Sequence, residues 1–237
     1  MRRLLDMLDL SADAGTPAFS TEDVERRLIA GGCWLIAAAV AFQSVAHLAD
    51  HLVFDLSSDF FNAGRDGGLF TFASAVATVI CGIVALVLVA VWPRRAVLLV
   101  GLSVLLCYLA LDDMYAGHER VAEKLDIDFL GIEDMGRVLW PLVFLPLLGA
   151  CFAGLLAVAS GLSAPARRLV HGGLALLVLA VALEMASILL VHVGLYRPST
   201  IYELEVTAEE GAELAGWLLI ALGMTTMLLR GGPVARR

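Results

Sequence analysis

Six apolar stretches, each long enough to cross a lipid bilayer, constrain this chain more than any other feature. A helix rises ~1.5 Å per residue, so crossing a hydrocarbon core of ~30 Å takes about 20 residues. Stretches this long do not alternate as barrel strands do, which leaves helices as the secondary structure. We therefore predict an all-α integral membrane protein, a bundle of six transmembrane helices, with spans over residues 28–54, 69–92, 96–116, 138–161, 169–195 and 208–230.

The spans use up most of the 237 residues. The mean hydropathy of +0.86 also lies outside the range of soluble proteins. We expect one transmembrane domain over residues 28–230, an N-terminal segment over 1–27 and a short tail over 231–237. The lipid bilayer is the expected partner, nucleic acid is not, and oligomerisation stays open.

The charges are distributed unequally between the two sides of this bundle. Of the 16 Lys and Arg residues, 11 fall on the side of the termini, and of the 24 Asp and Glu residues, 18 fall on the other. The two sides then carry net charges of +5 and −13, which agree with the total of −8. Basic connections stay in the cytoplasm, so both termini are predicted to be cytoplasmic and the protein to lie in the cell membrane.

Several ionisable residues share one depth near the acidic side. Counted from the nearest basic residue of the other side, His47, Asp112, Glu184 and Glu213 lie roughly 24 to 30 Å along their helices. An ionisable residue near hydrocarbon is costly and is a functional candidate by default. Four helices are thus expected to bring carboxylates and imidazoles into one layer.

The residue types in this layer are those that hold transition metals. His47 and His51 are four residues apart and share a helix face, and Glu209 and Glu213 repeat that spacing. Histidine with carboxylate is the ligand set of zinc and iron, and carboxylates from neighbouring helices can bridge two ions. We expect one or two divalent ions, zinc or iron. The predicted ligands are His47, His51, Asp112, His118, Glu119, Glu209, Glu210 and Glu213.

Two further residues are predicted to be catalytic. Glu184 lies in apolar sequence and needs a buried partner, so it would move a proton beside a metal-bound water, together with Asp113. His118 points away from Asp112 in a regular helix and reaches it only if the helix loosens at Gly117. The corresponding function is a metal-dependent hydrolase or di-metal oxidase that acts on a lipid or another hydrophobic substrate.

Two other functions remain open at this stage. The acidic layer would also suit a transporter or sensor of protons or metal cations. A path through the membrane would need polar residues to continue toward the side of the termini, and the halves of the spans on that side have almost none. The acids of residues 203–210 would alternatively form a solvated cap that recruits a cationic partner in a non-catalytic assembly protein. In both cases Thr207-Ala-Glu-Glu210 resembles a capping box and predicts the start of the sixth helix there.

Overall fold

The fold was analysed in a computed structural model, which describes residues 20–56, 58, 60–62, 68–124, 135–195 and 199–234. Six of its helices are long and apolar enough to cross a membrane, as the sequence predicts. The described elements are α2 (Thr21–Phe54), α3 (Leu69–Leu88), the short 3-10 helix η1 (Pro93–Arg95), α4 (Ala96–Met114), α5 (Gly117–Lys124), α6 (Met135–Ala159), α7 (Ala164–His192) and α8 (Thr200–Arg230). The chain is therefore a multi-pass membrane protein.

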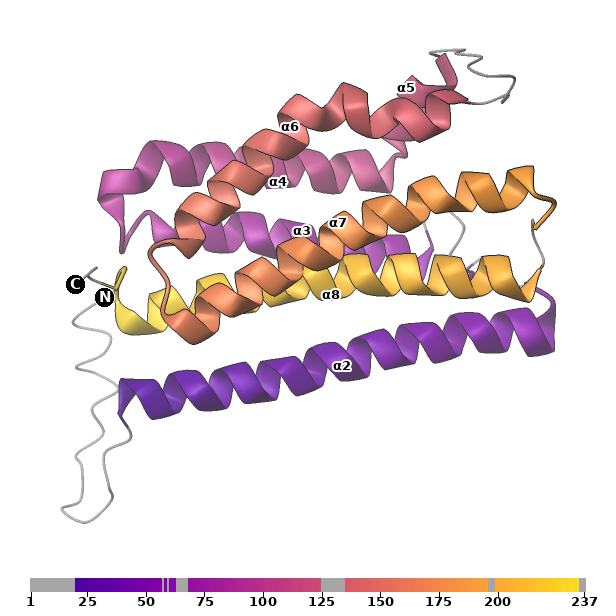
Figure 1. The fold of residues 1–237 in the computed structure, drawn as a ribbon. Coiled ribbons are helices and arrows are strands. Elements are labelled where there is room, and N and C mark those ends of the chain that lie inside the picture. Colours follow the sequence, from indigo (N-terminus) through magenta and orange to yellow (C-terminus); the bar gives the residue numbers. More distant parts are fainter. Residues whose placement is uncertain are drawn as a thin grey trace.

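Helix α8 lies at the centre of the bundle, where it packs against α2, α3 and α7 (Figure 1). The long helices run back and forth, so α2 begins at the end of the bundle where α8 finishes. We call this the near end and the opposite one the far end. Helix α6 crosses on the outside and packs against α4, α5 and α7. The core runs between α3, α4, α6, α7 and α8, and much of α2 presents apolar side chains outward.

Glycines let α7 and α8 approach each other closely. A Cβ atom on Gly173 would lie 2.5 Å from the carbonyl oxygen of Gly216, and one on Gly223 would lie 2.8 Å from that of Ala166. Small residues at such crossings allow backbone contact between transmembrane helices. This contact fixes the relative position of the helices that carry Glu184 and Glu213.

The sixth long helix begins earlier than predicted. Ser199 caps α8 and accepts a hydrogen bond from the backbone N–H of Tyr202. The hydroxyl of Thr207 instead donates to the carbonyl of Glu203 one turn back, so Thr207 lies inside the helix and does not start it. At the start of α2, by contrast, Ser20 accepts from the N–H of Asp23 as a helix cap does.

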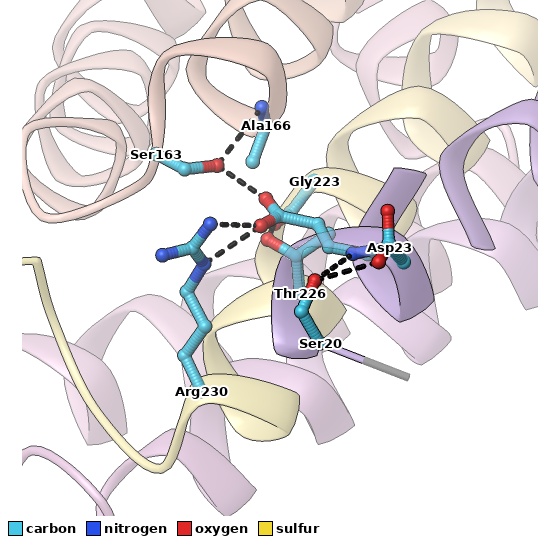
Figure 2. Close-up of polar contacts among 8 residues, drawn as sticks. Ser20, Asp23, Ser163, Ala166, Gly223, Thr226 and Arg230 are labelled. Atoms are coloured by element: carbon cyan, nitrogen blue, oxygen red, sulfur yellow. Dashed lines mark hydrogen bonds and ion pairs between the residues drawn. The ribbon is translucent and has the colours of Figure 1, made fainter. Parts of the chain in front are cut away.

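A buried ion pair ties three elements together at the near end. The Glu25 carboxylate, 3% exposed, accepts hydrogen bonds from Arg230 Nε at 2.7 Å, from a terminal guanidinium nitrogen of the same residue and from the Ser163 hydroxyl. Figure 2 shows the side chains of Arg230 and Ser163 converging from two different elements. We call Glu25, Ser163 and Arg230 the near-end clasp. It joins α2, the α6–α7 turn and the last turn of α8.

Candidate functional site: an acidic cavity at the far end

A break between α4 and α5 builds the first part of the site. Helix α4 ends at Met114, and Ala116 adopts a left-handed conformation with φ of 47° before α5 begins at Gly117. The chain turns back there, and His118 Nδ1 lies 2.8 Å from Asp112 Oδ2. A Cβ atom on residue 117 would lie 2.4 Å from Asp112 Oδ1. The contact between His118 and Asp112 thus requires both the helix break and the absence of a side chain at Gly117. The sequence indicated that the helix has to loosen at this glycine.

Glu184 of α7 completes this cluster. Its Oε1 atom lies 3.6 Å from His118 Nε2 and accepts a hydrogen bond of 2.9 Å from the indole of Trp140 on α6. The rings of His118 and Trp140 are in contact, with their centroids 4.4 Å apart. Glu184, which lies in apolar sequence and was expected to need a buried partner, therefore has polar partners on two helices, His118 of α5 and Trp140 of α6.

The charge of His118 follows from these neighbours. Burial lowers the pKa of the imidazole, but its contacts with Asp112 and Glu184 favour the charged form more strongly and raise the pKa to about 10. His118 is consequently an imidazolium at neutral pH and connects two carboxylates from different helices. A group with this pKa is a fixed cation and not a general base at pH 7.

A cavity of about 410 Å³ adjoins this cluster. Most of its wall is apolar and comes from α6 and α7. Its ionisable side chains gather at one part of the wall and come from α4, α5, α7 and α8. The Glu213 carboxylate accepts a hydrogen bond of 3.2 Å from the Trp217 indole, one turn further along α8. The ionisable residues that line the cavity are Asp112, Asp113, His118, Glu184, Glu209 and Glu213.

The two histidines of α2 belong to a different cluster. His47 Nε2 lies 3.0 Å from Glu203 Oε2, and both side chains are fully buried. One turn further along α2, His51 Nε2 lies 3.5 Å from the Thr200 hydroxyl, which is a marginal hydrogen-bond distance. Both histidines therefore face the first turns of α8. The idea that Glu203 forms part of a solvated acidic cap is wrong, because its side chain is completely enclosed.

The structure divides the predicted metal ligands. The cavity is lined by four of the predicted ligands, Asp112, His118, Glu209 and Glu213. It is also lined by the predicted catalytic residues Glu184 and Asp113. Three other predicted ligands do not line it, namely His47, His51 and Glu210, and the side chain of Glu119 lies outside the described part of the chain. Within the described residues, no group of three or more His, Cys, Asp or Glu side chains is arranged to hold a metal ion. The structure therefore does not support metal binding.

Sequence reasoning missed the tryptophans of the site and the near-end clasp. Trp140 and Trp217 each donate to a partly buried carboxylate, and an indole N–H in an otherwise apolar span is the signal that could have identified them. Glu25 gave no comparable signal, because it belongs to a polar segment and its partner Arg230 is 205 residues away. Its burial depends on the way α2 packs against α8.

The comparisons place the chain in one family. Residues 27–228 match the family described as "Domain of unknown function (DUF8692)". This range contains four of the six spans in full and most of the first and the last. The chain therefore belongs to this family. The searches of curated proteins and of solved structures gave no match.

Proposed function

We propose that this member of the DUF8692 family binds an amphiphilic molecule within the membrane, with the apolar tail in the α6–α7 part of the cavity and a cationic head at its acidic part. The observation that carries the proposal is the composition of one cavity wall. A long apolar surface from Pro141 to Phe152 on α6 and from Leu177 to Val181 on α7 adjoins six ionisable side chains. Ligand sites commonly combine an apolar wall with a few convergent polar groups.

The charge of this wall favours a cation. Five carboxylates line the cavity, whereas His118 is the one basic side chain among its described lining residues. His118 is already engaged by Asp112 and Glu184. An additional positive charge would interact favourably with the five carboxylates of this wall, because the surroundings have a low dielectric constant.

Aromatic side chains lie where the head and the tail of such a ligand would meet. Trp140 packs edge-to-face with Phe144 on α6, with ring centroids 5.9 Å apart, and both residues line the cavity. Trp217 contributes a further indole from α8. Tryptophan faces attract organic cations, so these rings would add to the electrostatic preference for a positively charged head.

A metal-dependent enzyme, which the sequence predicted, is the second candidate. Asp113, Glu209 and Glu213 line the same cavity and carboxylate oxygens bind divalent cations, although no three such side chains are arranged around one ion position in the described residues. Glu184 and Asp113 would then keep their proposed roles in proton transfer. Metal analysis of the purified protein by mass spectrometry tests this candidate. Stoichiometric zinc or iron that is lost in Glu213→Gln would support it, and a metal-free, folded protein would oppose it.

Ligand titration tests the main proposal. The protein is placed in lipid nanodiscs with Trp34 and Trp92 replaced by Phe, so that Trp140 and Trp217 report on the cavity. Decyltrimethylammonium, decanol and decyl sulfate then share one chain length and differ in the charge of the head. We expect saturable fluorescence changes with the cation, about tenfold tighter than with the anion, which corresponds to ~1.4 kcal/mol.

A matched pair of variants assigns that binding to the cavity. Glu213→Gln removes one acid of the cavity, whereas Glu205→Gln removes a half-buried acid of the same helix that does not line it. We expect weaker binding of decyltrimethylammonium in the first variant alone. Equal affinities for the three probes, or equal losses in the two variants, would reject the proposal.

A further inference from the structure

A second cavity lies on the far end of α2, separate from the first. It has a volume of about 460 Å³, and its wall contains Phe42, Asp50 and Phe54 of α2 together with Ser58 and Phe61 of the following turn. Positions 42, 46, 50 and 54 are four residues apart, so they form one stripe along the helix. We call this cavity the α2 groove. None of its lining residues lines the α4–α8 cavity.

The chain after α2 folds back to close this groove. Asp55 and Leu56 both adopt left-handed conformations, with φ values of 53° and 54°. The N–H of Leu56 then donates to the carbonyl of Asp50, and the N–H of Ser58 donates to the Asp50 carboxylate at 3.2 Å. Two consecutive non-glycine residues in this conformation are costly, so the surrounding structure has to hold them in place.

The carboxylate of Asp50 lacks compensation on one side. The residue is 2% exposed, and its Oδ2 atom has no hydrogen-bond partner in the part of the chain that the structure describes. Its Oδ1 atom receives one neutral backbone donor. A buried anion with this little support is unfavourable unless a positive charge lies nearby. Asp50 also lines the groove, so a cation in the groove would lie near this carboxylate.

The other walls decide which kind of cation fits. Phe42, Phe54 and Phe61 offer ring faces and no hydrogen-bond acceptor. A metal ion or a primary ammonium would lose most of its water and gain few oxygen ligands, because Asp50 and Ser58 are the described lining residues that have polar side chains. A quaternary ammonium group needs no hydrogen bonds and is attracted by aromatic faces and by a carboxylate at short range.

We propose that the α2 groove binds a quaternary ammonium group, such as the trimethylammonium head of a choline lipid. Its depth agrees with this ligand. Asp50 lies 23 residues beyond Arg27 in the same helix, or roughly 35 Å, whereas the hydrocarbon core of a bilayer measures about 30 Å. The groove is thus at the level of lipid head groups on the far side. Phe42 and Phe54, each 60% exposed, lie where lipid would surround the helix.

Native mass spectrometry of delipidated protein in an uncharged detergent tests this site. The protein carries Glu209→Gln and Glu213→Gln, so that cation binding in the α4–α8 cavity is weakened and does not obscure the result. Dioleoyl phosphatidylcholine and dioleoyl phosphatidylglycerol are added separately, and tetramethylammonium serves as the free cation. We expect phosphatidylcholine to bind about tenfold more tightly than phosphatidylglycerol.

Two pairs of variants assign that preference to the groove. Asp50→Asn keeps an oxygen acceptor for Ser58 but removes the charge, and Asp55→Asn removes an exposed charge five residues away. Phe54→Leu removes a ring of the groove, and Phe72→Leu removes a similarly exposed ring of α3 that does not line it. We expect Asp50→Asn and Phe54→Leu to abolish the lipid preference and the two controls to keep it. Thermal unfolding confirms that each variant is folded.

The outcomes separate the two sources of the cation. Binding of phosphatidylcholine without tetramethylammonium assigns the groove to a lipid, and binding of both assigns it to quaternary ammonium groups in general. Both results support the site. Equal binding of the two lipids, or an unchanged preference in Asp50→Asn, would overturn it.

Discussion

The imidazole of His118 lies 2.8 Å from the carboxylate of Asp112, although a regular helix would place these two residues about 120° apart around its axis. The break at Ala116 removes that separation. As a result, a cation of α5 joins an acid of α4 to Glu184 of α7. The position of this cation shapes the polar part of the cavity.

Substitution of Gly117 by alanine should disrupt this contact. The new Cβ atom would lie 2.4 Å from Asp112 Oδ1, so the carboxylate has to move and its distance from His118 increases. We expect a loss of stability of about 1 to 3 kcal/mol, as for other overpacked sites. Gly101→Ala is the control, because a Cβ atom at that position meets nothing within 4 Å. Thermal unfolding of both variants in detergent measures the difference, and similar midpoints would contradict the prediction.

The stability of the protein should fall as the pH rises from about 6.5 to about 10. The folded state holds the pKa of His118 at about 10, above the ordinary histidine value of 6.5. A group with a raised folded pKa contributes its full stabilisation below the unfolded pKa and loses it as the pH rises through the folded value. Unfolding midpoints measured across this range should therefore decrease, and His118→Gln should flatten the decrease.

The control for this pH dependence is His171→Gln, which removes an exposed histidine near the start of α7. This variant should keep the decrease of the wild-type protein. An unchanged slope in His118→Gln would show that other groups cause the pH dependence.

The buried pair of His47 and Glu203 should be energetically coupled. Its atoms lie 3.0 Å apart and are inaccessible to solvent, so the two side chains interact without screening by water. A double-mutant cycle with His47→Ala and Glu203→Ala should give a coupling energy of about 2 kcal/mol. The cycle with His51→Ala and Thr200→Ala, whose contact measures 3.5 Å, should give less than about 0.5 kcal/mol. Equal values in the two cycles would be inconsistent with the structure.

The near-end clasp should hold α2 against the rest of the bundle. Arg230→Gln removes the positive charge beside the buried carboxylate of Glu25, and we expect a loss of about 3 kcal/mol in unfolding free energy. Glu22→Gln removes an exposed acid of the same helical turn and should have little effect. Hydrogen exchange of the α2 backbone should also be faster in Arg230→Gln alone. Unchanged exchange there would mean that the clasp does not secure the helix.

The sequence predicts the extent of the long helices better than it predicts which side chains of other helices they contact. Apolar stretches of the required length identify all six long helices, because the bilayer fixes how long a spanning helix must be. The capping-box pattern Thr207-Ala-Glu-Glu210 predicts the start of the last helix at Thr207, whereas α8 begins at Thr200. The partner that buries Glu203 is His47, which lies 156 residues away and is invisible to a local pattern.

The predicted layer of acids and imidazoles shows the same limit. Depth along each helix follows from counting residues, and the structure places Asp112, Glu184 and Glu213 on the wall of one cavity. Counting does not give the order of the helices around the bundle. His47 has a similar depth, but α2 packs against α8 and turns this histidine toward Glu203. A single layer in the sequence therefore became two clusters in the structure.

Photoaffinity labelling within the α4–α8 cavity tests the proposed function most directly. An alkyltrimethylammonium probe with a diazirine at the end of its tail is activated in nanodiscs, and the labelled peptides are identified by mass spectrometry. The account predicts labelling of α6 and α7 near Phe144, Leu148 and Val181, which unlabelled decyltrimethylammonium suppresses and Glu213→Gln weakens. Labelling confined to outward-facing residues such as Val97 and Val104, unaffected by the competitor, would contradict it.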